Sequence, residues 1–128
     1  MPYQYCKHYT RDEARALLPK VRRWLGQIQE LRCELEKLDK RICGAMGGGN
    51  DVGGHSVNES LKKIAALKDV VSEFEARCIL IKDLDRGLID FPAIVGDREV
   101  FLCWEMGEED IEFWHDLDAG YAGREPLP

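Results

Sequence analysis

The chain of 128 residues is long enough for one compact domain, which we assign to residues 1–128. Hydrophobic residues make up 45% of the chain and charged residues 33%, and so high a charged share favours long solvent-exposed helices. No apolar stretch approaches the roughly 20 residues that a membrane span needs, and the N-terminus lacks the apolar core of a signal peptide. We therefore expect a cytoplasmic protein with no membrane partner.

The net charge of −6 is distributed unevenly. Residues 1–82 contain 15 Lys and Arg against 11 Asp and Glu, whereas residues 83–128 contain 3 Arg against 13 Asp and Glu. An acidic half repels the phosphate backbone of nucleic acids, so we expect no nucleic-acid partner.

A capping box marks the start of the first predicted helix, because the side chains of Thr10 and Glu13 can each accept a hydrogen bond from the other's amide. Apolar residues then alternate at spacings of three and four: Ala14, Leu17, Val21, Trp24, Ile28, Leu31, Leu35, Leu38 and Ile42. This heptad pattern predicts a coiled-coil-like helix over residues 10–44, with a kink at Pro19. The glycine-rich segment 45–55 is interpreted as a linker, since it lacks the strand and the Gly-Lys-Ser/Thr sequence of a phosphate-binding loop.

A second capping box, Ser56 to Glu59, precedes a second predicted helix over residues 56–77. The short linker predicts that the two helices fold back on each other antiparallel, which leaves the first turns of helix one in need of another partner. Two helices and a small sheet cannot cover every apolar residue, so we predict a homodimer with helices paired between chains. The residues expected at the helix interfaces are Leu31, Leu35, Leu38, Ala65 and Val70.

After Cys78 the sequence pattern changes to short β-rich segments separated by turn residues. The pattern predicts an antiparallel β-meander over residues 78–118, followed by an irregular tail over 119–128 that contains Gly120, Gly123 and Pro126. The expected fold class is therefore α+β, with a long antiparallel helical hairpin followed by a small antiparallel β-meander.

Several stretches resemble a known family. They are Tyr9-Thr10 with Glu13-Ala14-Arg15 and Leu18-Pro19, then 82–93, Leu102-Cys103-Trp104 and 113–124. These motifs are similar to those of the prokaryotic family catalogued as domain of unknown function 2203, and the similarity covers nearly the whole chain. At the junction of helix two and the first strand, where the family usually has a glycine, this chain has Ala76-Arg77-Cys78. The resemblance implies a small cytosolic protein and brings no established activity, cofactor or catalytic residue.

The acidic C-terminal part contains one histidine among many carboxylates. Imidazole and carboxylates together can bind a divalent metal ion, and an open coordination position could activate water for hydrolysis. The candidate ligands are His115, Asp116, Asp118, Asp90 and Glu105, with Asp83 and Asp85 nearby. The alternative is a buried histidine whose ring bonds a carboxylate or backbone carbonyl, while the acids pair with arginines.

The five cysteines are odd in number and form no Cys-x-x-Cys pair, which argues against a disulfide framework or a zinc ribbon and favours reduced thiols. Cys103 lies in a predicted strand, where it is either a nucleophile paired with His115 or a small buried hydrophobic residue. Arg124 could hold a carboxylate or phosphate, or pair with a neighbouring acid.

Two functions are consistent with these patterns. The heptad seam favours a non-enzymatic homo-oligomeric interaction or adaptor module. The C-terminal motifs favour a protein that binds a metal or small ligand, with hydrolysis as its conceivable activity, centred on His115.

Overall fold

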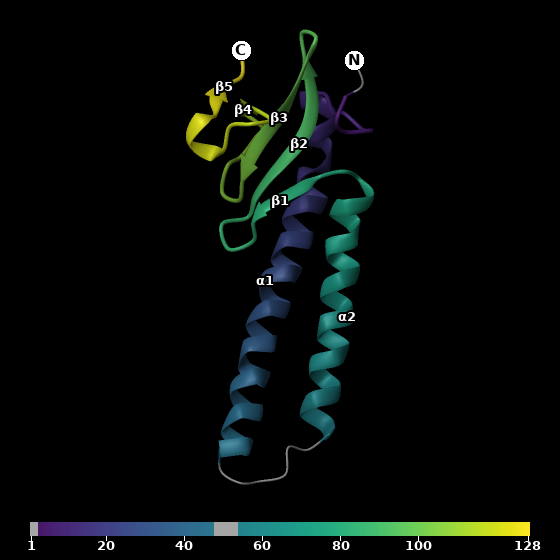
Figure 1. Ribbon diagram of the computed structural model, residues 1–128, viewed down its shortest axis with the longest axis vertical. Helices are drawn as coiled ribbons and strands as arrows, with labels where there is room; N and C mark the ends of the chain where they lie inside the picture. The colour runs from purple at the N-terminus through teal and green to yellow at the C-terminus, as the bar shows by residue number, and fades with distance from the viewer. Residues whose placement is uncertain (1–2, 48–53) are drawn as a thin grey trace.

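The structure, a computed structural model, describes residues 3–47 and 54–128, without the side chains of residues 42–47. Two long helices, α1 (Arg11–Gly47) and α2 (Gly54–Ala76), lie side by side, and a small sheet lies at one end of the pair (Figure 1). The predicted linker 45–55 is shorter in the structure, since its ends belong to the two helices, and its middle lies outside the described residues. Among the described helices, none combines the length and apolar character that crossing a membrane requires.

The start of α1 confirms the predicted capping box. The Thr10 amide donates to Glu13 Oε1 at 3.0 Å, and the Glu13 amide donates to Thr10 Oγ1 at 3.1 Å. The backbone amide and the side chain of Thr10 lower the pKa of Glu13, because their hydrogen bonds to its side chain favour the carboxylate form. The helix then continues through Pro19. The second capping box is not in the predicted place, since α2 begins at Gly54 and Glu59 pairs with His55 instead.

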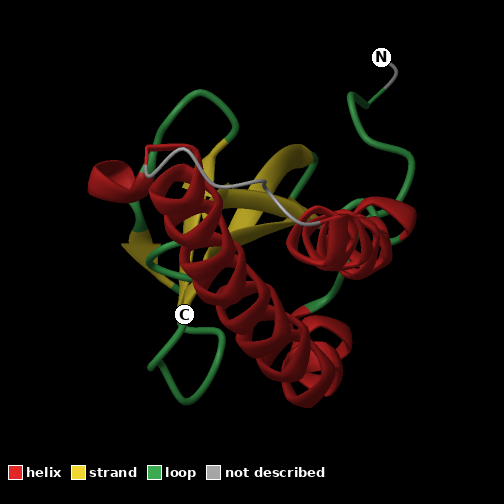
Figure 2. Ribbon diagram, turned by 90° about the horizontal axis from the view of Figure 1, so that it is seen from below, coloured by secondary structure: helices red, strands yellow, loops and turns green. Residues whose placement is uncertain are grey.

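The two helices form the predicted antiparallel hairpin. The rings of Trp24 and Phe74 are 5.5 Å apart, and farther along the hairpin Lys63 Nζ lies 2.7 Å from Glu34 Oε2. From the first contact to the second, the residue number rises by ten on α1 and falls by eleven on α2, which shows that the helices are antiparallel. Toward the sheet, Phe74 is buried in the core and Leu67, Val70 and Val71 pack against it. Seen from the helical end, the strands lie beyond the two helices (Figure 2).

Five strands follow as a meander in the order β1-β2-β3-β4-β5, with every neighbouring pair antiparallel. They are β1 (Leu80–Asp83), β2 (Leu88–Val95), β3 (Arg98–Glu105), β4 (Phe113–Asp116) and β5 (Glu125–Pro126). The segment 119–128, for which we expect no regular structure, contains the short 3-10 helix η1 (Tyr121–Gly123) and β5. The confirmed fold class is α+β.

The sheet has one apolar face, because successive residues of a strand point to opposite sides. On β2 this face carries Ile89, Phe91 and Ala93, and on β3 it carries Val100, Leu102 and Trp104. These residues share one core with the first turns of α1, so the sheet is the partner that the overhanging part of helix one needs. The α1 residues in this core are Tyr9 just before the helix, then Ala14, Leu18, Val21, Trp24, Leu25 and Ile28.

The opposite face of the sheet is also buried, although it lies outside that core. It carries Leu88 and Asp90 on β2, Phe101 and Cys103 on β3, and His115 on β4. Its cover comes from the two ends of the chain. Tyr5 packs on Phe101 with ring centroids 5.5 Å apart. Residues 119–124 cover the part of the same face around Cys103 and His115.

Candidate metal centre

Three neighbouring strands bring three possible ligands together on this second face. Asp90 on β2 lies directly opposite Cys103 on β3. His115 on β4 lies opposite Phe101, which is two residues from Cys103 and therefore on the same face. The strand register alone thus places an aspartate, a cysteine and a histidine side by side.

The three side chains approach one another closely enough to share an ion. Their ligand atoms all lie within 4.8 Å of one another, and His115 Nε2 is 3.1 Å from Asp90 Oδ1. Asp90 and Cys103 are 1% exposed and His115 is 3% exposed. A buried group of this composition is a candidate for a metal centre, because carboxylate oxygen, thiolate sulfur and imidazole nitrogen are the ligands that proteins use for Zn²⁺.

The other ring nitrogen of His115 fixes which tautomer the site presents. Nδ1 is 2.8 Å from the backbone carbonyl oxygen of Asp116. A carbonyl can only accept a hydrogen bond, so Nδ1 carries the proton. In the neutral ring the lone pair is then on Nε2, which can accept a hydrogen bond from the carboxyl group of Asp90, 3.1 Å away. Metal-binding histidines are commonly oriented by a hydrogen bond of this kind.

Burial controls the electrostatics of the cluster. It raises the pKa of Asp90, against the opposing effects of His115 and Lys82. Burial and the neighbouring Asp90 raise the pKa of Cys103 to about 11, although Arg124 acts in the opposite direction. The thiol is therefore protonated at neutral pH, and His115 Nε2 is bonded to Asp90. Both facts disfavour a Cys103–His115 nucleophile pair, which needs a thiolate next to a base.

Two cations flank the cluster in different ways. Lys82 Nζ lies 3.9 Å from Asp90 Oδ2 and 4.9 Å from the centroid of the Phe101 ring. Arg124 Nη1 lies 3.9 Å from Cys103 Sγ, but the same guanidinium binds both carboxylate oxygens of Glu108, at 2.6 and 3.3 Å. Arg124 thus pairs with a neighbouring acid, which is one of the two roles that the sequence leaves open.

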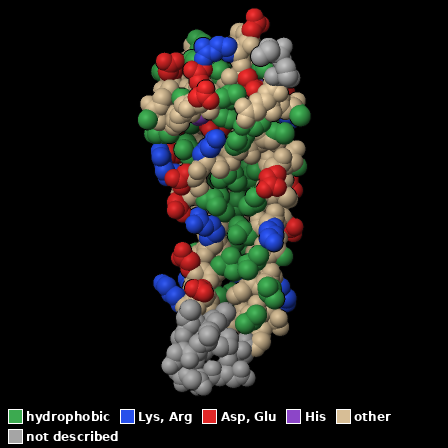
Figure 3. Space-filling model, viewed as in Figure 1, with side chains coloured by type: hydrophobic (Ala, Val, Ile, Leu, Met, Phe, Trp, Pro, Cys, Tyr) green, Lys and Arg blue, Asp and Glu red, His purple; other side chains and the backbone are tan. Residues whose placement is uncertain are grey.

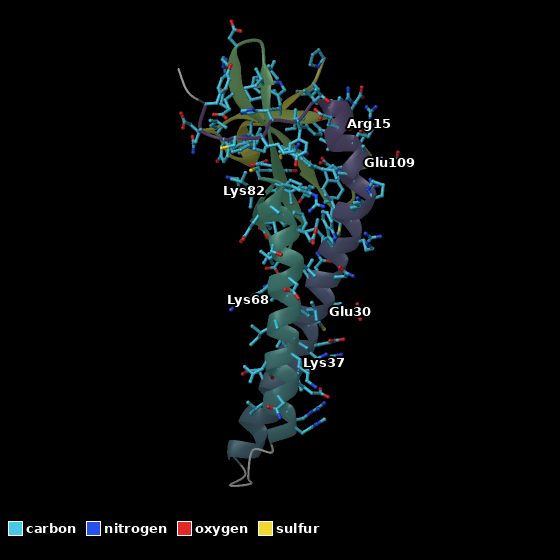
Figure 4. The ribbon with its side chains drawn as sticks, turned by 90° about the vertical axis from the view of Figure 1, so that its right-hand side faces the viewer. Arg15, Glu30, Lys37, Lys68, Lys82 and Glu109 are labelled. Atoms are coloured by element: carbon cyan, nitrogen blue, oxygen red, sulfur yellow. The ribbon has the colours of Figure 1, made fainter. Side chains whose placement is uncertain are left out.

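A small cavity of about 110 Å³ opens onto the cluster. Asp90, Cys103, His115 and Leu88 form its buried part, while Lys82, Gly120 and Tyr121 are its exposed residues. Figure 4 shows Lys82 beside the sheet, whereas Glu30, Lys37 and Lys68 lie along the helices. Lys82 therefore lies between solvent and the buried side chains.

The other predicted ligands do not join this cluster. Glu105 pairs with Arg86 at 2.7 Å, and the carboxylate of Asp116 pairs with Arg98, so that only its backbone carbonyl reaches His115. Asp118 is exposed and lies with Asp116 along a different depression of the surface. Of the five predicted ligands the structure brings together Asp90 and His115.

Two further acids near the start of the sheet are also engaged elsewhere. Asp85 pairs with Arg32 at 2.8 Å, and Asp83 Oδ1 accepts hydrogen bonds from the amides of Asp85 and Arg86. Carboxylates that repel one another are stabilised by arginines and backbone amides, which explains why so few of them converge on His115.

Cys103 is the residue that our interpretation of the ligand set missed. The signal is present in the sequence, because β2 and β3 are joined by the two-residue turn Gly96-Asp97, and Gly96 has the positive φ of 64° that such a turn favours. Counting outward from this turn pairs Asp90 with Cys103. The described cysteines Cys6, Cys33, Cys78 and Cys103 are not joined in disulfides.

The comparisons with known proteins identify a family and no activity. The model of a family described as an uncharacterised conserved protein, DUF2203, matches residues 7–127. Neither the comparison with curated proteins nor the comparison with solved structures found a match.

Proposed function

Because the chain belongs to the uncharacterised conserved protein family DUF2203, we propose its function from the geometry of the site: it binds a divalent transition metal ion, and Zn²⁺ in particular. The observation that carries this proposal is the convergence of Asp90, Cys103 and His115 within 4.8 Å. Zn²⁺ is bound in proteins by this combination of carboxylate oxygen, thiolate sulfur and imidazole nitrogen.

The spacing of the three ligand atoms supports a tetrahedral ion. Ligands about 2.0–2.3 Å from such an ion are about 3.3–3.6 Å from one another. His115 Nε2 and Asp90 Oδ1 are 3.1 Å apart, so this pair has to separate by only a few tenths of an ångström. Cys103 Sγ lies within 4.8 Å of both atoms and completes the set by moving toward the ion. The hydrogen bond from Nδ1 to the Asp116 carbonyl already holds the ring in the orientation that binding needs.

The charges also support a divalent ion. Asp90 and a deprotonated Cys103 supply two negative charges, which balance the ion inside a buried site. Cys103 binds as the thiolate, since a metal ion displaces the thiol proton in spite of its raised pKa. Metal binding is thus coupled to the release of a proton.

The proposal is tested by adding Zn²⁺ to metal-free protein without an affinity tag and recording thermal unfolding and bound metal. A ligand that binds only the folded state adds about 2.7 kcal/mol when its concentration is 100 times Kd. We expect one equivalent of Zn²⁺ and a raised Tm, both lost in Cys103→Ala and His115→Ala. Cys33→Ala is the matched control, because Cys33 is an exposed thiol on α1. An unchanged Zn²⁺ response in both site variants would contradict the proposal.

A second function, self-association through the hairpin, is supported by apolar side chains on α2. Leu61 is 59% exposed, Val57 40% and Ile64 39%, and their spacing places them on one face of the helix. Figure 3 shows hydrophobic side chains at the surface along the seam between the helices. A second copy would offer the same stripe and could cover it in a four-helix bundle.

The residues predicted for the helix interfaces fit this arrangement unequally. Leu38 is buried within one hairpin, Leu31 and Leu35 are half-buried, Val70 packs against the core, and Ala65 is exposed.

Light scattering at micromolar concentration tests the association. We expect a dimer that Leu61→Lys dissociates, while Asp69→Lys, which adds a lysine at an exposed position of the same helix, leaves it intact. A monomer mass for the unsubstituted protein would contradict this second function.

A further inference from the structure

We infer that the metal ion takes its fourth ligand from solution, and that this ligand is a small carboxylate held by Lys82. The inference rests on the proposed metal centre and names what that centre binds. It follows from three features of the site: the number of protein ligands, the cavity above them and the charge at its rim.

The first feature is the ligand count. The cluster supplies three ligand atoms from the part of the chain that the structure describes, whereas a tetrahedral ion takes four. Structural zinc sites have four protein ligands, and sites that bind exchangeable ligands have three. Glu105 and Asp116, the acids closest to the ligands along the strands, are paired with Arg86 and Arg98 and are not available as a fourth.

The second feature is the cavity, which sets the size of the ligand. It has a volume of about 110 Å³ and is lined by the three ligands themselves together with Ala119, Gly120 and Tyr121. A water molecule takes up about 30 Å³ of liquid, so this space accommodates a molecule of a few heavy atoms. Acetate fits such a space, whereas a whole nucleotide or peptide would extend out of it.

The third feature is the charge of Lys82, the only cation among the described residues that line this cavity. Its ammonium group lies 3.9 Å from Asp90 Oδ2, and its side chain is 42% exposed. Once Asp90 and the Cys103 thiolate neutralise the metal ion, the positive charge of Lys82 has no counterpart left. One negative charge on the fourth ligand balances it, which favours a singly charged carboxylate over neutral water.

The neighbouring arginines do not compete for this role. Arg124 is held by both carboxylate oxygens of Glu108, and Arg86 by Glu105. Both guanidinium groups also lie over the ring of Tyr121, 4.2 Å from its centroid, whereas Lys82 lies over the ring of Phe101. A lysine at the rim, by contrast, has a flexible stem and three donors, so it can turn from Asp90 toward a bound carboxylate.

Cobalt-loaded protein tests the inference, because the visible spectrum of Co²⁺ reports its coordination and the thiolate–cobalt charge-transfer band reports Cys103. We expect acetate, titrated at constant ionic strength, to change the visible bands in a saturable way. Lys82→Gln should weaken acetate binding about tenfold while the charge-transfer band persists. Imidazole, a neutral ligand for the same position, should bind both proteins alike. Lys68→Gln, a lysine on α2, is the control and should behave like the unsubstituted protein.

The outcomes separate the two proposals. A charge-transfer band with visible bands that do not respond to acetate overturns the inference and leaves the metal centre standing. Equal acetate affinity in Lys82→Gln and the unsubstituted protein overturns the role of Lys82. Absence of the charge-transfer band in the unsubstituted protein overturns both proposals.

Discussion

The two faces of the sheet are buried to the same degree and are built from different chemistry. Phe91 and Trp104 on the face toward the helices are fully buried among apolar side chains. Asp90 and Cys103, next to them in sequence, are as deeply buried on the other face, where polar His115 joins them beside apolar residues. Apolar burial stabilises the fold directly, whereas a buried polar group must first regain the hydrogen bonds that it had in water.

The second face therefore contributes less stability for the same burial. Its polar side chains are all satisfied, since none of the buried side-chain nitrogen or oxygen atoms in the described residues lacks a hydrogen-bond partner. In the function that we propose, this cluster of satisfied but costly polar groups serves binding, while the opposite face serves the fold.

The largest effect is expected on the helix-facing side. Phe91→Ala removes a fully buried ring that packs edge-on against Tyr9, with ring centroids 5.3 Å apart. We expect a loss of about 3–5 kcal/mol in the free energy of unfolding, measured with urea. Val95→Ala on the same strand, where the side chain is 43% exposed, should change stability by less than about 0.5 kcal/mol. Similar losses in both variants would show that this face is not the stabilising one.

A smaller and more specific effect is expected at Asp90. Asp90→Ala leaves His115 Nε2 without a partner inside the protein and should cost about 1–3 kcal/mol of unfolding free energy. Asp90→Asn should cost less, because its amide can donate to the lone pair of Nε2. Both variants should lose the thermal shift caused by Zn²⁺, since neither supplies a carboxylate. If Asp90→Asn retained that shift, the carboxylate would not be a metal ligand.

The next effect is a loss of stability at low pH. It depends on Glu99, which binds residues 4–8, the N-terminal segment that covers part of the polar face. Burial alone would raise the pKa of Glu99, but hydrogen bonds from His8 and from the amides of Tyr5 and Gln4 outweigh burial and lower it. A carboxyl group with a lower pKa in the folded state stabilises the fold above its unfolded-state pKa, and this stability is lost as the pH falls through the folded-state pKa.

Unfolding by urea at pH 7 and at decreasing pH below about 4.5 measures this contribution. We expect it to be about 1 kcal/mol, the typical value of a hydrogen-bonded carboxylate at a partly buried position. Glu99→Gln should be less stable at pH 7 and should lose less on acidification. Parallel pH profiles of the two proteins would assign the acid sensitivity to other groups.

The fold could largely be predicted from local patterns. The capping box at Thr10, the heptad spacing and the turns between short β-rich segments are set by neighbouring residues, and all have their expected structural counterparts. The cover of the polar face could not be predicted in this way. It depends on where η1 and β5 return to the sheet, and a glycine- and proline-rich tail gives no periodic signal for that position.

Two of the three members of the candidate site, Asp90 and His115, were predictable. His115 and Asp90 follow from residue type, but sequence proximity also suggested Asp116, Asp118 and Glu105, and only strand register decides between them. Adjacent residues of a strand point to opposite faces, so the side chain of Asp116 cannot share the face of His115. Cys103 belongs to the cluster because it lies opposite Asp90 across the Gly96-Asp97 turn, which is a relation between strands.

The smallest effect is expected at Asp118, which is close to His115 in sequence but is not part of the buried cluster. Asp118 is three residues from His115 and exposed, whereas Asp90 is 25 residues away and in contact with it. Asp118→Asn should therefore leave the Zn²⁺ thermal shift unchanged and alter the unfolding free energy by less than about 0.5 kcal/mol. Both quantities are measured in the same thermal and urea experiments as for Asp90→Asn, which is the same chemical change at the buried position. If Asp118→Asn abolished the Zn²⁺ response and Asp90→Asn did not, the metal would belong to the exposed acids at the end of β4, and the buried polar face would have only a structural role.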